Sequence, residues 1–270
     1  MMQTKRPLAR LAFQAGTFER GARMLPEEMA VALSYNGTTQ AVMMATPAAL
    51  EDFARGFTLT EGIAAPEEID SITVVETDLG IDLQIWLQPE AEGRLAVRRR
   101  TMAGPVGCGL CGIDSLEEAV RRLPPVTASA LRLTPAQVFA AVGALPAQQP
   151  LHDATRAVHA AAFWTPAVGM VTSREDVGRH NALDKLAGAT AGLALSAGAV
   201  VLTSRVSIDM VQKCAVMGAP VLIAVSAPTA HAVDMAEAAG ITLIALARTD
   251  RFEVFTHPNR LISEESTHVA

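Results

Sequence analysis

The alternation of polar and apolar positions predicts strands in the first hundred residues. The segment IDLQIWL (81–87) has an apolar side chain at every second position, which is typical of a half-buried strand. We expect RLAVRRR (94–100) to be its partner strand. Residues 29–46 predict two further strands around Asn36-Gly37, because the tight turn of a hairpin needs positive φ at both central positions.

A helix is expected between these strands. The segment PAALEDFARGFTLTEGI (47–63) has a proline at an early position and acidic residues in its first turn, which is typical of a helix start. A hairpin, a helix and further strands together predict a small N-terminal α+β unit.

The second half of the chain has a different pattern. The segments AVVLTS (199–204), PVLIAVS (220–226) and ITLIALAR (241–248) are short, continuous apolar runs. Between them lie IDMVQKCAVMG (208–218) and PTAHAVDMAEAAG (228–240), which predict helices that end in glycine. Strands that alternate with helices in this way indicate a parallel sheet buried on both faces.

The chain is therefore expected to be an α/β protein of two units. We place an N-terminal α+β domain at residues 1–104 and a C-terminal α/β domain at residues 105–270. A glycine-rich loop at 104–114 lies close to the junction and is expected to be mobile. Ligand sites often lie at such junctions.

Composition narrows the class of protein. Half of the 270 residues are hydrophobic but only 4% are aromatic, so aliphatic side chains must fill the core. The net charge of −6 argues against a nucleic-acid partner. Residues 1–20 lack the apolar core of a signal peptide. The most apolar stretch, residues 189–206, fits a buried helix end, turn and strand better than a membrane span.

Three cysteines do not make a disulfide framework in a chain of this length. We therefore expect a soluble cytoplasmic protein with reduced thiols and no membrane association. Cys214 lies on the apolar face of a predicted helix, and we interpret it as a small core residue.

Cys108 and Cys111 lie in the loop GPVGCGLCG (104–112), just before a predicted helix. The loop also matches the G-x-G-x-x-G pattern of dinucleotide-binding proteins. Pro124-Pro125 ends the helix early, however, no clear strand follows, and residues 128–140 contain no acid that could hold a ribose, so we reject this reading.

Zinc chemistry also finds little support in the sequence. A structural zinc ion usually has four ligands, and a single Cys-x-x-Cys pair supplies two. Cys214, His152 or His159 could complete such a site, but no spacing requires it. A zinc deaminase needs His-x-Glu and Pro-Cys-x-x-Cys, and the chain has neither. We predict no resident metal.

A reactive thiol fits the loop better. Ser115 and Glu118 form a capping box at the helix start, and the positive end of a helix favours a thiolate. The arginines at 98–100 would add to this effect if they lie near. Glycines at 107, 109 and 112 give a partner access to the sulfur atoms. The alternative is that the two thiols are incidental.

Two other polar segments are candidate sites. His152 and His159 are seven residues apart, which places them on one face if a helix spans both; they are candidates for metal or anion binding, or for a structural role. The segment SREDVGRHNALDKL (173–186) contains Arg179, His180 and Asn181, which have the donors that phosphate and carboxylate groups need. The alternative is a solvated loop and helix start.

Polar turns also follow two of the predicted parallel strands. Arg205 and Ser207 come after AVVLTS, and SAPTA (226–230) comes after VLIAV. Ligands of open parallel sheets bind at the carboxyl ends of the strands, and helix N-termini there favour phosphate. The two turns therefore predict a ligand that carries an anion.

Four segments together resemble the formate dehydrogenase accessory sulfurtransferase family. They are CGLCG (108–112), REDVGRHNALDK (174–185), SRVSIDMVQKCAVMGAPVLIAVSAPTA (204–230) and GITLIALAR (240–248). The resemblance runs from about residue 30 to residue 262. The second and third segments are long and specific, far beyond a Cys-x-x-Cys match.

The resemblance implies a function. Members take sulfur as a cysteine persulfide from a cysteine desulfurase. They pass it to the molybdenum (or tungsten) bis-guanine-dinucleotide cofactor, which then enters formate dehydrogenase. It also implies a homodimer and a C-terminal domain with a cytidine-deaminase-like fold that lacks the zinc motif.

The resemblance further implies which residues act. Cys108 matches the persulfide-bearing cysteine and Cys111 its partner, and we assign them as sulfur acceptor and as relay or resolving thiol. The segment that matches the region associated with the cofactor consists of Phe252, Glu253, Val254, Phe255, Thr256 and His257. We expect Arg179, His180, Asn181 and Arg205 to contact the phosphates or guanine of the cofactor.

Three positions depart from the family pattern. Gly107 precedes Cys108 where serine is expected, TSR (203–205) replaces SGR, and His231 replaces a leucine. Two other functions remain open: a cofactor-binding chaperone without sulfur transfer, and a metal-dependent hydrolase that uses the two cysteines with His152 or His159.

Overall fold

The computed structural model describes residues 2–102, 125–126 and 129–262. They form a mixed α/β protein with three sheets. The predicted loop with Cys108, Cys111 and the capping box at Ser115, and the predicted domain boundary at 104/105, lie outside the described residues.

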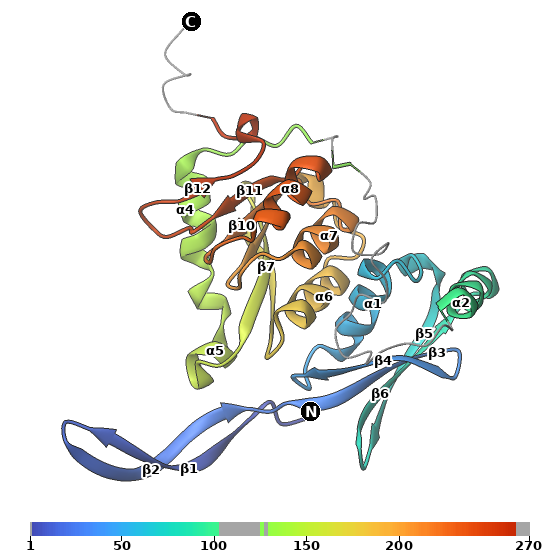
Figure 1. Ribbon diagram of the computed structural model, residues 1–270, viewed down its shortest axis with the longest axis horizontal. Coiled ribbons are helices and arrows are strands. Elements are labelled where there is room, and N and C mark those ends of the chain that lie inside the picture. Colours follow the sequence, from blue (N-terminus) through green and yellow to red (C-terminus); the bar gives the residue numbers. More distant parts are fainter. Residues whose placement is uncertain (1, 103–124, 127–128, 263–270) are drawn as a thin grey trace, which may run out of the picture.

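The N-terminal part begins with a hairpin that the sequence pattern did not predict. Its antiparallel strands are β1 (Lys5–Gln14) and β2 (Thr17–Pro26). This hairpin, residues 5–26, is called the arm below. Figure 1 shows it leading away from the rest of the molecule.

A four-stranded sheet follows, in the order β4-β3-β6-β5. Its strands and covering helices are β3 (Met29–Tyr35), β4 (Thr38–Ala45), α1 (Leu50–Thr60), β5 (Ile69–Thr77), β6 (Gly80–Leu87) and α2 (Pro89–Met102). The predicted hairpin at Asn36-Gly37 is confirmed, with positive φ at both residues. The predicted strand at 81–87 is also confirmed as β6.

Alternate side chains of this sheet form a core with the two helices. Leu33 and Leu83 are fully buried and lie in one cluster with Phe53 of α1 and with Ala91 and Leu95 of α2. The opposite face of the sheet, called the open face below, exposes Val42, Met44 and Trp86 to about half of their area (53%, 51% and 47%).

Two details of the N-terminal prediction were wrong. RLAVRRR is not a strand but part of α2, which Pro89 and two acidic residues begin and whose buried Ala91 and Leu95 are spaced four apart. Pro47 also precedes its helix rather than opening it, because Ala49 adopts a left-handed conformation and α1 begins at Leu50.

The C-terminal part is a six-stranded sheet in the order β12-β11-β10-β9-β7-β8. Its elements are α4 (Pro135–Ala144), α5 (Pro150–Thr155), β7 (His159–Thr165), β8 (Gly169–Asp176), α6 (Arg179–Ala189), β9 (Ala199–Leu202), α7 (Ile208–Val216), β10 (Val221–Ala224), α8 (Ala230–Ala239), β11 (Thr242–Ala245) and β12 (Glu253–Val254). The predicted parallel strands are confirmed as β9, β10 and β11.

Helices cover both faces of this sheet (Figure 1). On one face, Leu202 and Leu222 belong to a cluster that includes Leu186 of α6 and Met210 of α7. On the other face, Val201 and Ile223 pack with α4. Every residue of β9, β10 and β11 is buried, which explains why these strands are continuous apolar runs.

The helix expected to carry both His152 and His159 does not exist. Arg156 adopts a left-handed conformation and ends α5 at Thr155, so His152 lies in a short helix and His159 begins β7.

The N-terminal and C-terminal parts meet where α1 crosses α6. A methyl group at Gly56 would lie 1.6 Å from the Asp184 carbonyl oxygen, and one at Gly188 would lie 1.9 Å from the Asp52 carbonyl oxygen. The two helix backbones therefore touch, and the absence of side chains at these glycines permits it.

Candidate functional site

The candidate site lies along one edge of the six-stranded sheet, where β9, β10 and β11 have their carboxyl ends. The loops after β9 and β10 are joined by a bridge between Val206 and Pro228. The Thr229 amide donates to the Val206 carbonyl at 3.0 Å. The prediction that these two polar turns lie at one edge is confirmed.

The start of α6 lies at the same edge. β8 is antiparallel to β7, and β7 is antiparallel to β9, so the carboxyl ends of β8 and β9 point the same way. Arg179 and His180 therefore lie on the edge that also holds Arg205. His180 Nε2 lies 3.4 Å from a carboxylate oxygen of Asp209, in the first turn of α7.

Two nitrogen atoms at this edge lack hydrogen-bond partners. Arg179 Nε and His180 Nε2 are both buried atoms without a hydrogen bond within the part of the chain that the structure describes. The His180–Asp209 contact is an ion pair when the ring is protonated, but it is not aligned as a hydrogen bond. The imidazole beside it holds the pKa of Asp209 below its ordinary value. An anionic ligand would satisfy such nitrogen donors.

His159 lies close to this cationic group. It begins β7 opposite Asp176, the last residue of β8. Burial lowers the pKa of His159, and the positive charge of Arg179 lowers it further. His159 is therefore neutral at pH 7, and the guanidinium of Arg179 is the permanent positive charge that can attract an anion here.

Asn181 has a different role from its two neighbours in the sequence. It is 2% exposed, and its amide nitrogen donates to the Met44 carbonyl (2.8 Å) and to Asp176 (3.0 Å). A side chain at Gly178 would press against this amide, since a methyl group there would lie 2.8 Å from it. Asn181 thus ties the start of α6 to β4.

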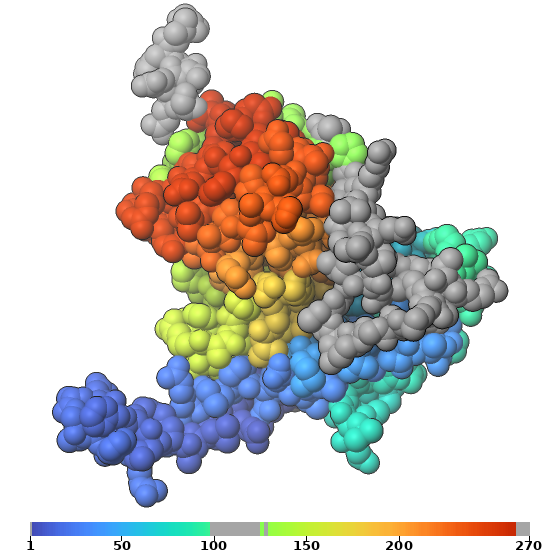
Figure 2. All heavy atoms as spheres, viewed as in Figure 1, coloured from blue at the N-terminus to red at the C-terminus, as the bar shows by residue number. Residues whose placement is uncertain are grey.

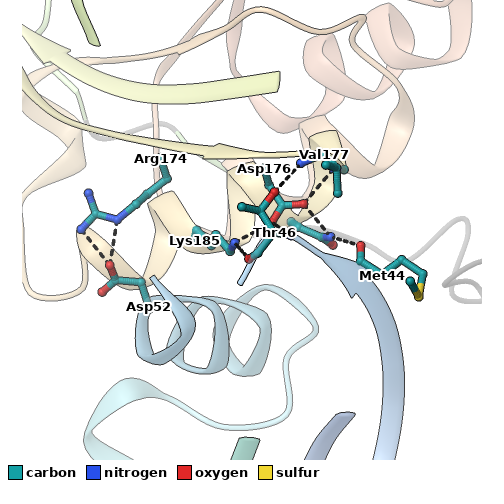
Figure 3. A network of polar contacts seen from close by, with 9 residues as sticks. Met44, Thr46, Asp52, Arg174, Asp176, Val177 and Lys185 are labelled. Atoms are coloured by element: carbon teal, nitrogen blue, oxygen red, sulfur yellow. Dashed lines mark hydrogen bonds and ion pairs between the residues drawn. The ribbon is translucent and has the colours of Figure 1, made fainter. Parts of the chain in front are cut away.

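Asp176 is the centre of this buried network (Figure 3). One carboxylate oxygen accepts from the Gly178 amide (2.8 Å) and from Asn181, and the other accepts from the Thr46 amide (3.0 Å) and from Lys185 (2.5 Å). Lys185 also donates to the Thr46 carbonyl at 2.8 Å. Asp176 and Lys185 are both completely buried. The network fixes where α6 starts relative to the N-terminal sheet.

Two further ion pairs join the same elements. Arg174 contacts Asp52 of α1 at 2.7 Å, as Figure 3 also shows. Lys213 of α7 contacts Asp184 of α6 at 2.8 Å and Glu61 at 2.7 Å. Although burial lowers the pKa of Lys213, the two carboxylates raise it more, so this lysine stays charged. Much of the REDVGRHNALDK motif therefore holds the two parts together.

The segment Phe252–His257 does not lie at one place. Glu253 pairs with Ala245, at the carboxyl end of β11, and Phe252 and Glu253 line a surface pocket together with Leu246, Arg248 and Arg251. Thr256 is buried, and its hydroxyl donates to the Ile241 carbonyl (2.6 Å), at the other end of β11. His257 contacts the Glu237 carbonyl of α8 at 2.8 Å.

The predicted ligand residues thus fall into two groups. Arg179, His180 and Arg205 lie near β8 and β9, whereas Phe252 and Glu253 lie beside β11. Two strand spacings separate β9 from β11 and four separate β8 from β11, which is about 10 to 19 Å. One large ligand on this edge can reach both groups, but a small anion cannot.

Sequence reasoning missed Arg248 and Arg251. Arg248 ends the predicted strand segment ITLIALAR and Arg251 follows it, and Arg248 donates to the Val225 carbonyl (2.5 Å) at the end of β10. The rule that found Arg205, polar residues after a parallel strand, applies to them equally.

Cys214 and the histidines offer no metal site. Cys214 is fully buried, and burial raises the pKa of its thiol to about 12. His152 Nδ1 faces the Val158 carbonyl at 3.2 Å. Among the described residues, no group of three His, Cys, Asp or Glu side chains can hold a metal ion. No helix in the described part of the chain is long and apolar enough to cross a membrane.

Comparisons with known proteins all find similarity to one family. Residues 26–262 match the FdhD/NarQ family. A protein of Agrobacterium fabrum named sulfur carrier protein FdhD is 53% identical over 260 residues, which is 95% of this chain and 96% of the relative. Proteins of the same name in Brucella abortus (52% identical; 95% and 97% covered) and Cupriavidus necator (49%; 96% and 93%) are also similar.

A solved structure has the same fold. It is the crystal structure of a candidate formate dehydrogenase accessory protein from Desulfotalea psychrophila. The TM-score is 0.77 at 25% identity, and the match covers 96% of this chain and all of the other.

Proposed function

The chain belongs to the FdhD/NarQ family, and we propose that it is a sulfur carrier in the maturation of formate dehydrogenase. The observation that supports this most is the similarity of almost the whole chain, at 53% identity, to a protein named as a sulfur carrier. The accessory-protein name of the structural relative agrees with it.

The state of the cysteines supports an assignment of the carrying atom. The chain has three cysteines. Cys214 is inaccessible, and its raised pKa keeps it a thiol rather than the nucleophilic thiolate. A sulfur carried on a cysteine must therefore reside on Cys108 or Cys111. We assign Cys108 as the acceptor, as the family resemblance implies.

The loading step of the proposed transfer balances without an external oxidant or reductant. The Cys108 thiolate attacks the outer sulfur of a persulfide on a cysteine desulfurase, and the desulfurase thiolate leaves. The new persulfide on Cys108 then gives its outer sulfur, at the oxidation level of elemental sulfur, to the acceptor and returns to a thiolate; an acceptor that holds this sulfur as sulfide supplies the two electrons itself. Alternatively, Cys111 attacks Cys108, releases hydrosulfide and leaves a disulfide that a cellular thiol must reduce.

The proposed acceptor is the molybdenum bis-guanine-dinucleotide cofactor, bound as cargo. It carries two diphosphates and two guanines, so it is large and strongly anionic. The two groups at the sheet edge suit such a cargo, with Arg179, His180 and Arg205 at one end and the Phe252–Glu253 pocket at the other. Asn181 would act by positioning α6, because its amide is engaged within the protein.

Three broader expectations belong to the same proposal. The C-terminal domain is cytidine-deaminase-like without the zinc motif, and its layered sheet agrees with that expectation. The protein acts in the cytoplasm as a homodimer. Its macromolecular partners are a cysteine desulfurase and formate dehydrogenase.

A complementation experiment tests the function. Cells that lack this activity would express the parent, Cys108→Ala or Cys214→Ala, and formate dehydrogenase activity would be measured alongside binding of guanosine diphosphate to each purified protein. We expect Cys108→Ala to bind the nucleotide but lose maturation, and Cys214→Ala to keep both. Full maturation by Cys108→Ala would instead indicate a cofactor-binding chaperone without sulfur transfer.

A further inference from the structure

The arm has little support from its own chain. Its ten-residue strands are joined by Ala15 and Gly16, which both have positive φ. Figures 1 and 2 show it projecting from the body, and its base touches α5 through β2. A two-stranded ribbon of this kind is at best marginally stable in water. Something that covers it would therefore stabilise it.

One face of the arm carries a group of large apolar side chains. Residues paired directly across the hairpin share a face, so Phe13 lies with Phe18, and Leu11 lies on the same side two residues away. The two phenyl rings pack with centroids 5.0 Å apart. Leu11, Phe13 and Phe18 are nevertheless 59%, 65% and 69% exposed. Exposed aromatic side chains gathered in this way mark an interaction surface.

The arm is basic on both faces. Arg6, Arg10 and Arg23 lie with Glu19 on the face opposite the phenyl rings, whereas Lys5 and Arg20 lie on the face of the rings, with Arg20 directly across from Leu11. Residues 5–26 contain five cationic side chains and one carboxylate, a net charge of +4 within a chain of −6. The remainder of the chain therefore carries −10. The arm is attracted to the body of another copy of its own chain more than to a neutral surface.

The body has a matching surface on the open face of the four-stranded sheet. Val42, Met44 and Trp86 are about half exposed there. The neighbouring β5–β6 turn consists of Asp78, which is exposed, and Leu79, which is 91% exposed. The arm cannot cover this surface in its own chain, because two residues join β2 to β3 and the arm leads away from the sheet (Figure 1).

We propose that the arm of each molecule packs on the open face of the four-stranded sheet of a second copy, so that the two copies exchange arms. A standard interface needs about 800 Å² from each partner. Phe13, Phe18 and Leu11 alone supply on the order of 400 Å² per copy, and the arginine stems and the receiving sheet supply more. The exchange is reciprocal, as expected for a two-fold dimer.

The direct test is the oligomeric state of the full chain, measured by sedimentation velocity over a range of concentrations. We expect the parent to be a dimer. Replacing both phenylalanines, Phe13→Ser with Phe18→Ser, should raise the dissociation constant at least about tenfold, because aromatic anchors dominate interface energies. Leu193→Ser, which removes another exposed apolar side chain (47%) elsewhere, should leave the dimer intact.

A charge exchange identifies the receiving surface. One variant reverses the charge on the arm face that carries the phenyl rings (Arg20→Glu), and another reverses the charge of the β5–β6 turn (Asp78→Arg). Each alone should be at least about tenfold weaker as a dimer, while an equal mixture should form the heterodimer, since both of its arms then meet opposite charge.

Three results would overturn the proposal: a parent that stays monomeric, a dimer that the phenylalanine changes leave intact, or a mixture that does not associate. Unchanged circular dichroism of each variant checks that it folds. The test is independent of sulfur transfer, because loading of Cys108 with sulfur is measured separately and can fail while the dimer persists.

Discussion

The two sides of the α6 helix do opposite things. On the inner face of α6, Asp184, Lys185 and Gly188 meet α1, and their polar groups are satisfied by partners within the protein. At the edge, Arg179 and His180 keep nitrogen atoms without hydrogen bonds in the described part of the molecule. The comparison teaches that one polar segment fixes the fold with one side and leaves donors for a ligand on the other.

Removing a buried charge should give the largest effect. In Lys185→Met, the Asp176 carboxylate stays buried without its cation, so we expect a loss of about 3–5 kcal/mol in the free energy of unfolding. Chemical denaturation measures it. Arg55→Ala removes an exposed pair with Glu51 and should cost less than about 1 kcal/mol. Equal losses in the two variants would show that the buried ion pair contributes no more to stability than the exposed one.

A methyl group at the helix crossing should have the next largest effect. Gly188→Ala places that group against the Asp52 carbonyl, so α1 and α6 must separate, at a cost of about 1–3 kcal/mol. Gly143→Ala is the matched control, because it lies in α4 with nothing within 4 Å of the added methyl group. It should be neutral or stabilising by up to about 1 kcal/mol. A neutral Gly188→Ala would contradict the backbone contact.

A substitution at the sheet edge should weaken ligand binding and leave the free energy of unfolding almost unchanged. Arg179→Gln removes a guanidinium from an anion site, and we expect affinity for guanosine diphosphate to fall about tenfold, with unfolding free energy changed by less than about 0.5 kcal/mol. Calorimetric titration measures the affinity, and Arg55→Ala provides a control with the same loss of charge. A large loss of stability without a loss of affinity would show that Arg179 supports the fold rather than binding the anion.

The smallest effect concerns the pH dependence of stability. Burial and Arg179 keep the pKa of His159 below its ordinary value of 6.5, so the unfolded chain binds a proton near that pH and the folded chain does not. Stability should therefore be full above pH 6.5 and fall as the pH drops below it. His159→Gln should flatten this slope, whereas His231→Gln, on an exposed side chain, should not. A His159 ring that titrates at or above 6.5 by NMR would contradict this.

Some of the fold was predictable because its signals are local. The continuous apolar runs of β9, β10 and β11 report burial on both faces, and Asn36-Gly37 specifies a turn by conformation alone. The α2 helix was mistaken for a strand because RLAVRRR was taken by itself as the partner of IDLQIWL, while Ala91 and Leu95 carry the helical spacing. The arm escaped notice because its strands face no core, so no burial pattern marks them.

The candidate site likewise has residues that the sequence could predict and residues that it could not. Arg205 could be placed from the rule for parallel sheets, because it directly follows a strand. The role of Asp176 and Lys185 could not, since Thr46 lies 130 residues away along the chain and only folding brings it within 3.0 Å of Asp176. The split of Phe252–His257 depends on the pairing of β12 with β11, which two residues form and no sequence pattern indicates.

The central claim is that sulfur travels on Cys108, and peptide mass spectrometry tests it most directly. The reduced protein would be incubated with a cysteine desulfurase and cysteine, then digested and its cysteine peptides weighed. The account predicts one added sulfur on the peptide that contains Cys108, removed by reductant and absent in Cys108→Ala, with the Cys214 peptide unchanged. No added sulfur while the desulfurase turns over, or sulfur on Cys214, would contradict it.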